Sequence, residues 1–90
     1  MSKIFLLPQQ QIIDLFEKNK ITEVVIERVS VKEWYPIFLV NDQEHGRVRC
    51  SIRVGKSNEV RKWADLRLLT EFLIEKCNVD ECLLKLKKTE

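Results

Sequence analysis

Two stretches of the 90-residue chain repeat their apolar residues at three- and four-residue steps, which is the period of an amphipathic helix. The first begins near Pro8, a residue suited to the first turn of a helix, and predicts a helix over about residues 8–19. The second predicts a helix over about residues 65–76, and Asn78 after it tolerates the left-handed conformation that ends helices. The apolar stripes consist of Ile12, Ile13, Leu15 and Phe16 in the first helix and Leu66, Leu69, Leu73 and Cys77 in the second.

Four other stretches have the composition or the two-residue alternation of β-strands. The clearest is Arg47–Val54, where apolar side chains at even positions face inward, and three arginines and Ser51 at odd positions face outward. Gly46 and the polar residues before it form a turn, so this strand and the preceding one are expected to make a β-hairpin. The expected strands cover residues 23–31, 34–41, 47–54 and 81–87.

Two points in this pattern stay open. Pro36 lies inside the second expected strand, although proline is tolerated only at sheet edges or bulges. Ile4–Leu7 is a short apolar segment that fits either a strand or a lead-in to the first helix.

The order of these elements is α-β-β-β-α-β and predicts an α+β fold. We expect an antiparallel sheet of three or four strands with the second helix packed on one face and the first helix on another surface or an edge. Because the chain has no linker and no internal repeat, residues 1–90 are expected to form a single domain. The expected core consists of Val48, Cys50, Ile52, Leu66, Leu69, Phe72, Leu73, Leu84 and Leu86.

Composition excludes several classes of protein. With 44% hydrophobic and 33% charged residues and only two glycines and two prolines, the chain is neither a disordered tail nor a collagen-like repeat. No apolar run approaches the roughly 20 residues that cross a bilayer, so no membrane partner is expected. The three cysteines are an odd number without CxxC spacing, and no signal peptide is recognisable, which together predict a reducing, cytoplasmic location.

The sequence carries no combination of residues that points to catalysis. Gly55-Lys56-Ser57 resembles the end of a phosphate-binding loop, but Cys50 stands where such a loop requires its first glycine. His45, the only histidine, lies in a polar turn, and neither it nor Cys77 and Cys82 has partners at the spacing of metal ligands. We therefore expect a protein that is not an enzyme, with no catalytic residue, cofactor or metal site.

Trp34, Tyr35 and Trp63 allow two interpretations. On an exposed sheet they could stack on nucleic-acid bases, as in proteins that bind single strands. In a small domain such residues more often fill the core. Trp63 directly precedes the second helix, which favours packing in the core.

Charge is distributed unevenly along the chain, whose net charge is +2. Residues 47–62 carry six basic side chains against Glu59 alone, a net charge of +5, while the remainder carries −3. Arginines two and four residues apart on one strand would form a cationic ridge about 20 Å long that could follow a phosphate backbone or enter the DNA major groove. Alternatively, Glu27 or Glu33 on a neighbouring strand could pair with these arginines on an ordinary solvated face. The candidate nucleic-acid-binding residues are Arg47, Arg49, Arg53, Lys56, Arg61 and Lys62.

From Trp34 to about residue 86 the chain resembles small plasmid-encoded accessory proteins of partition and stability functions. The likeness consists of the hairpin beginning at Trp34-Tyr35, the strand 47–54, the segment 59–63 running into the second helix, and the closing strand 79–86. In that group an arginine and an aromatic residue precede a Leu-Asp helix start, and a glycine ends the helix. Arg61 and Trp63 fit this pattern, whereas Asp65-Leu66 reverses the dipeptide and Cys77-Asn78 replaces the glycine.

The order of three strands followed by a helix also resembles the arm-type DNA-binding domains of phage integrases. Both resemblances imply a non-catalytic accessory protein of a plasmid or phage, a mobile element, that contacts DNA through the basic strand and loop. The alternative is a protein–protein adaptor or a homodimer that binds no nucleic acid, and that could pair its exposed strand edges or pack Ile4–Leu7 against a neighbour.

Overall fold

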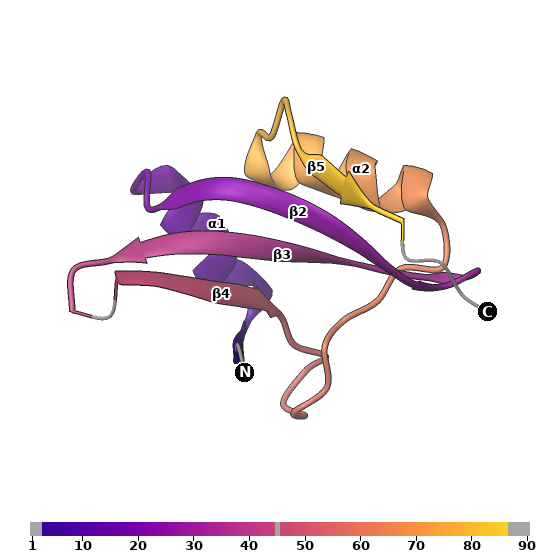
Figure 1. The fold of residues 1–90 in the computed structure, drawn as a ribbon, viewed down its shortest axis with the longest axis horizontal. Helices are drawn as coiled ribbons and strands as arrows, with labels where there is room; N and C mark the ends of the chain where they lie inside the picture. Colours follow the sequence, from indigo (N-terminus) through magenta and orange to yellow (C-terminus); the bar gives the residue numbers. More distant parts are fainter. Residues whose placement is uncertain (1–2, 45, 87–90) are drawn as a thin grey trace.

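The computed structural model describes residues 3–44 and 46–86 of the chain. It has an α+β architecture, as predicted, in which five strands form one twisted sheet and two helices pack on the same face of it (Figure 1). The elements in chain order are β1 (Ile4–Leu7), α1 (Gln9–Glu17), β2 (Ile21–Ser30), β3 (Glu33–Asp42), β4 (Gly46–Ile52), α2 (Leu66–Cys77) and β5 (Leu83–Lys85).

The sheet is mixed and has five strands, whereas the sequence predicted an antiparallel sheet of three or four. The strand order is β1-β4-β3-β2-β5; β2, β3 and β4 are antiparallel neighbours, while β1 runs parallel to β4 and β5 runs parallel to β2. The predicted element order lacks β1, because Ile4–Leu7 is too short for its period to separate a strand from a helix lead-in. Its partner in the sheet lies about 45 positions later, where Ile4 pairs with Arg49.

The core lies between the two helices and one face of the sheet. Its buried residues are Ile12, Val24, Ile26, Phe38, Val40, Cys50, Ile52, Trp63, Leu69, Leu73 and Cys77. The core position of Trp63 agrees with the interpretation favoured by the sequence. Two expected core residues are exposed instead, Leu84 and Leu86, the latter by 61%, because β5 forms the edge of the sheet.

Pro36 lies inside β3 at the point where the neighbour of that strand changes. The paired residues of β3 and β4 extend no further than Phe38, while Trp34 exchanges two backbone hydrogen bonds with Trp63, of 2.8 and 2.7 Å. The missing N–H of proline therefore falls between two ladders, where it costs little pairing. The Pro36 carbonyl accepts a 2.6 Å hydrogen bond from the hydroxyl of Ser51, which is fully buried and not exposed as the alternation predicted.

Both ends of α2 have local signals in the sequence. The side chain of Asp65 accepts a hydrogen bond from the backbone N–H of Arg67 at 2.9 Å, which caps the first turn. Asn78 takes the left-handed conformation, with φ of 57°, that the sequence predicted for the helix end. Within residues 3–44 and 46–86, neither helix has the length and apolar character needed to span a membrane.

Candidate interaction surface

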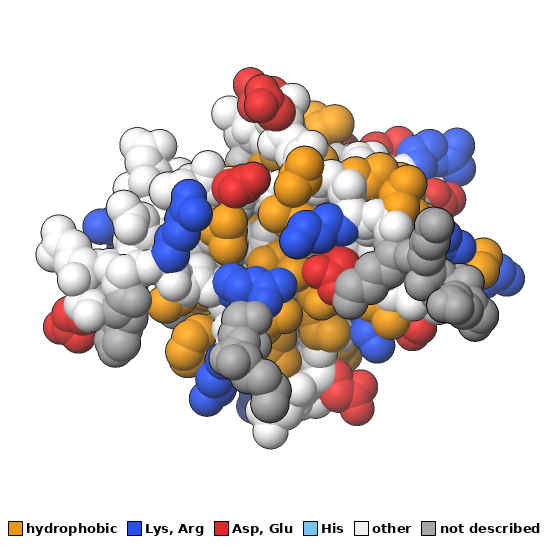
Figure 2. Space-filling view, viewed as in Figure 1, with side chains coloured by type: hydrophobic (Ala, Val, Ile, Leu, Met, Phe, Trp, Pro, Cys, Tyr) orange, Lys and Arg blue, Asp and Glu red, His pale blue; other side chains and the backbone are white. Residues whose placement is uncertain are grey.

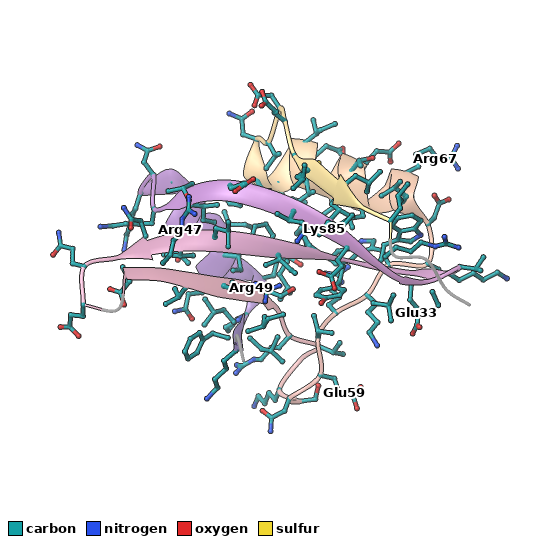
Figure 3. All side chains as sticks on the ribbon, viewed as in Figure 1. Glu33, Arg47, Arg49, Glu59, Arg67 and Lys85 are labelled. Carbon is teal, nitrogen blue, oxygen red and sulfur yellow. The ribbon has the colours of Figure 1, made fainter. Side chains whose placement is uncertain are left out.

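The face of the sheet opposite the helices, which we call the open sheet face, carries Arg47 and Arg49 of the six predicted DNA-contacting residues. Cys50 of β4 faces the core, so the alternating neighbours Arg47 and Arg49 lie on the other face (Figure 3). Lys85 of β5 lies on the same face, since its partner Glu27 in β2 alternates with the core residue Ile26. Figure 2 shows that apolar side chains occupy the centre of this face and that positive and negative side chains are interspersed around it.

Arg53 and Lys56 lie beyond the end of β4 and do not continue a ridge along the strand. The Nε of Arg53 donates a 3.0 Å hydrogen bond to the carbonyl of Gly55, which holds the guanidinium against its own loop. Lys56 is exposed in that loop.

Arg61 and Lys62 contact other parts of the fold. The Arg61 guanidinium lies 4.3 Å from the centre of the Trp63 ring and donates a 2.8 Å hydrogen bond to the Oε1 of Gln9 at the start of α1. Lys62 Nζ lies 3.7 Å from the Oε2 of Glu33 in an ion pair at the surface. The six cations therefore do not form one ridge: Arg47 and Arg49 lie on the open sheet face, Arg53 and Lys56 in a loop, and Arg61 against α1.

The centre of the open sheet face is apolar and contains one buried carboxylate. Val25 and Ile37 are buried there, and Glu27 beside them is also buried, with the Tyr35 hydroxyl donating to its Oε1 at 3.4 Å. A shallow hollow of about 290 Å³ in this face is lined by Glu23, Val25, Ile37, Leu39, Arg49, Leu83 and Lys85. This face has an apolar centre and charges of both signs, and so it differs from the uniformly positive surface that attracts a phosphate backbone.

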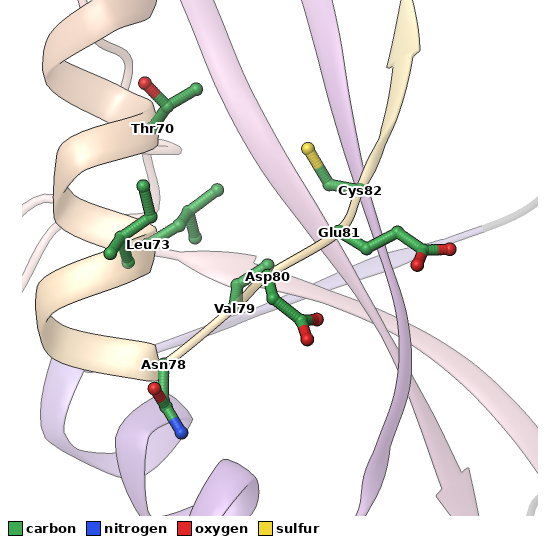
Figure 4. A pocket seen from close by; sticks show the side chains of 8 residues that line it. Thr70, Leu73, Asn78, Val79, Asp80, Glu81 and Cys82 are labelled. Atoms are coloured by element: carbon green, nitrogen blue, oxygen red, sulfur yellow. The ribbon is translucent and has the colours of Figure 1, made fainter.

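A second, more apolar surface lies at the β5 edge of the sheet. A cleft of about 440 Å³ separates α2 from the segment that leads into β5, and its walls are mostly apolar (Figure 4). In Figure 4 Cys82 points towards Thr70 and Leu73 of α2, whereas Glu81 points away from them, as expected for an extended chain. We call the four exposed residues along this edge the β5 surface; they are Ile74, Cys82, Leu83 and Leu84.

The sequence missed this surface because its residues carry the ordinary pattern of core positions. Leu84 belongs to an alternating run, and Ile74 lies beside the apolar stripe of α2. Only the position of β5 at the edge of the sheet leaves these side chains exposed. A helical or strand period shows which residues share a face, but it does not show whether another element covers that face.

Two of the three cysteines are buried, and the described part of the chain holds no cluster of metal ligands. Burial raises the pKa of the Cys50 and Cys77 thiols, that of Cys77 to about 11, so both are protonated at neutral pH and are poor nucleophiles or metal ligands. Residues 3–44 and 46–86 contain no group of three His, Cys, Asp or Glu side chains placed to hold a metal ion. His45 lies outside the described residues.

No protein-family model matches this chain, and comparisons with curated proteins and with solved structures find no significant match. The likeness to plasmid partition and stability proteins therefore stays a prediction from sequence.

Proposed function

We propose that this protein is a non-catalytic protein-interaction module that binds its partner through the β5 surface. The observation that carries this proposal is the exposure of three large apolar side chains at one edge of the sheet, with Ile74 59%, Leu83 49% and Leu84 43% exposed. Ile74 lines the cleft beside α2, whereas Leu83 and Leu84 lie on opposite faces of the edge strand β5. Large apolar side chains exposed along one edge are characteristic of protein interaction sites.

The backbone of β5 supports the same proposal. This strand pairs with β2 on one side, and no other strand among the described residues pairs with its outer side. The outer N–H and C=O groups of such an edge can accept an additional strand, which is a common mode of protein recognition.

The opposite edge of the sheet is less suited to a partner. Phe5 is the large exposed apolar residue of β1, and the ammonium group of Lys3 lies 5.4 Å from the centre of its ring. The charged side chain of Lys3 therefore protects this edge against apolar contacts.

The proposal can be tested with a photo-crosslinking amino acid at position 84 in cells that express the chain. The matched control position is Leu68, which is also exposed on α2 but lies on another side of the helix from Ile74, about 120° around the axis. We expect a covalent protein adduct from position 84 and none above background from position 68. Absence of an adduct at position 84 would contradict the proposal, and the mass of any adduct identifies the partner.

A second candidate function is contact with nucleic acid through the open sheet face, where Arg47, Arg49 and Lys85 lie together. Glu23 and Glu27 on the same face reduce the local positive charge. Binding by these cations would weaken steeply with added salt in a gel-shift experiment, and the double substitution Arg47→Ala/Arg49→Ala would weaken it for all DNA sequences alike. Salt-independent or absent binding would eliminate this candidate.

We also propose a location in the cytoplasm and a role as an accessory protein of a plasmid or phage. The cysteines at positions 50, 77 and 82 are free thiols, which supports a reducing, cytoplasmic location. The role as an accessory protein of a plasmid or phage rests on the sequence resemblance alone.

A further inference from the structure

We infer that the partner at the β5 surface is a second copy of this chain, joined by antiparallel pairing of the two β5 strands into one continuous sheet. This inference rests on the proposed function, because it names the occupant of the same surface. It is carried by the self-complementary order of charged and apolar residues along the edge.

Symmetry limits how two such edges can pair. Two identical strands that pair side by side and antiparallel within one sheet are related by a twofold axis normal to the sheet. One residue then faces its own copy, and residues equally distant from it on either side face each other. The faces of the two sheets also coincide, so the helices of both copies lie on the same side.

Only one register centred on an exposed residue of this edge matches its charges. With Leu83 on the axis and the pairing extended to the two residues that precede β5, Glu81 stands opposite the partner's Lys85, and Cys82 stands opposite the partner's Leu84. Each of these pairs occurs twice because of the symmetry. The register thus combines two pairs of opposite charge with two apolar pairs and a central leucine pair.

The neighbouring registers are unfavourable. Centring the axis on Cys82 places Glu81 opposite the partner's Leu83, and centring it on Leu84 places Leu83 opposite the partner's Lys85. Each of these two registers sets a charged residue opposite Leu83. In the register centred on Leu83, that leucine faces its own copy instead. Register is therefore specified by Glu81, Leu83 and Lys85, whose side chains alternate onto one face of the edge.

The position of Lys85 explains why a charged residue does not prevent this pairing. Within the chain Lys85 stands opposite Glu27 of β2. In the dimer its other side would face the partner's Glu81, so that the ammonium group lies between two carboxylates. A lysine on an edge strand opposes pairing with most other strands. Lys85 therefore favours a partner strand that places an acidic residue opposite it.

Charge reversal tests the inference in the purified full chain. Glu81→Lys places two lysines opposite each other at both ends of the interface and is expected to raise the dimer dissociation constant about tenfold, as measured by sedimentation. Glu81→Lys/Lys85→Gln removes that repulsion without setting a second carboxylate against Glu27, and it is expected to restore most of the affinity. Glu75→Lys makes the same change in charge at an exposed site of α2 and is expected to leave the dimer unchanged.

A disulfide tests the register independently of affinity. In a Cys82→Ser background, Leu83→Cys places two thiols directly opposite each other across the axis, within the Cα separation that a disulfide spans. We expect a disulfide-linked dimer under mild oxidation from position 83 and none from Leu68→Cys in the same background. Circular dichroism of each variant confirms that the chain is folded.

The possible outcomes distinguish failure of the β5 dimer from failure of the proposed function. A chain that is monomeric at all concentrations and forms no disulfide at position 83 overturns the inference, and so does a dimer that is indifferent to Glu81→Lys. If the inference fails in this way while crosslinking from position 84 yields an adduct with a different protein, the proposed function stands. If position 84 yields no adduct of any mass, the proposed function fails as well.

Discussion

At the scale of single residues, the pair Ser51 and Pro36 shows how a central strand accommodates proline. Ser51 is fully buried on the open side of the sheet and donates a 2.6 Å hydrogen bond to the Pro36 carbonyl. Strand alternation predicts that Ser51 points away from the helices, but it does not reveal the acceptor, because Pro36 lies 15 residues away. The proline looked unfavourable in the sequence because its neighbours in the sheet were unknown.

Replacing Ser51 with alanine is expected to lower the free energy of unfolding by about 1–3 kcal/mol, since it leaves the buried Pro36 carbonyl without this donor. Urea denaturation measures the change. The matched control is Ser57→Ala, because the Ser57 hydroxyl makes a similar 2.7 Å bond to the Val54 carbonyl at an exposed site. Equal losses in the two variants would contradict a special role for burial.

The cysteines differ in exposure, and we expect iodoacetamide to react fast with Cys82 and slowly with Cys50 and Cys77 in the native protein.

Burial raises the pKa of Cys77 from about 9 to about 11, so between these pH values the thiol ionises in the unfolded chain but not in the folded one. Stability should therefore fall as the pH rises from 9 to 11, and Cys77→Ala should reduce that fall. Thermal unfolding at a series of pH values measures this loss of stability, with Cys82→Ala as the control. If Cys77→Ala shows the same pH dependence as the wild-type chain, ionisation of Cys77 is not the cause.

At the scale of secondary-structure elements, the two helices and the strands β2, β3 and β4 form within a few residues of where the sequence predicted them. These elements are long enough for their apolar period to be clear. β1 and β5 have only four and three residues, and they are held by pairing with β4 and β2. Short strands of this kind depend on a distant partner, so their boundaries cannot be obtained from a local pattern.

Arg61 connects two elements that the sequence does not bring together. It contacts the Trp63 ring and donates to Gln9 of α1, so Arg61→Met is expected to lower the free energy of unfolding by about 1–2 kcal/mol. The matched control is Lys56→Met, at an exposed position in the loop after β4, which should change stability by less than about 0.5 kcal/mol. If both variants are equally stable in urea, Arg61 does not anchor this segment to α1.

At the scale of the whole molecule, the sheet ends in two short strands, and the edge at β5 exposes apolar side chains that no described helix or strand covers. A chain of 90 residues buries a limited core, and an additional interface would increase it. The six candidate cations became separated at this scale, because loop contacts hold Arg61 against α1 and Arg53 against its own loop, away from Arg47 and Arg49 on β4.

If the chain dimerises through β5, its melting temperature should rise with protein concentration, because association stabilises the folded state by mass action. Glu81→Lys should remove most of this dependence, while Glu75→Lys should leave it unchanged. Differential scanning calorimetry over a wide concentration range measures the effect. A melting temperature independent of concentration in the wild-type chain would argue against the dimer.

The sequence by itself determined the α+β class, the two amphipathic helices, the hairpin of β3 and β4 and the ends of α2, because these follow from side-chain period and capping over a few neighbouring residues. Tertiary structure alone decided the partners of β1 and β5, the burial of Ser51, the separation of the cations and the exposure of Leu83 and Leu84. The physical reason is that a local period shows which side chains share a face. Which face is then covered depends on segments that are far away in the chain.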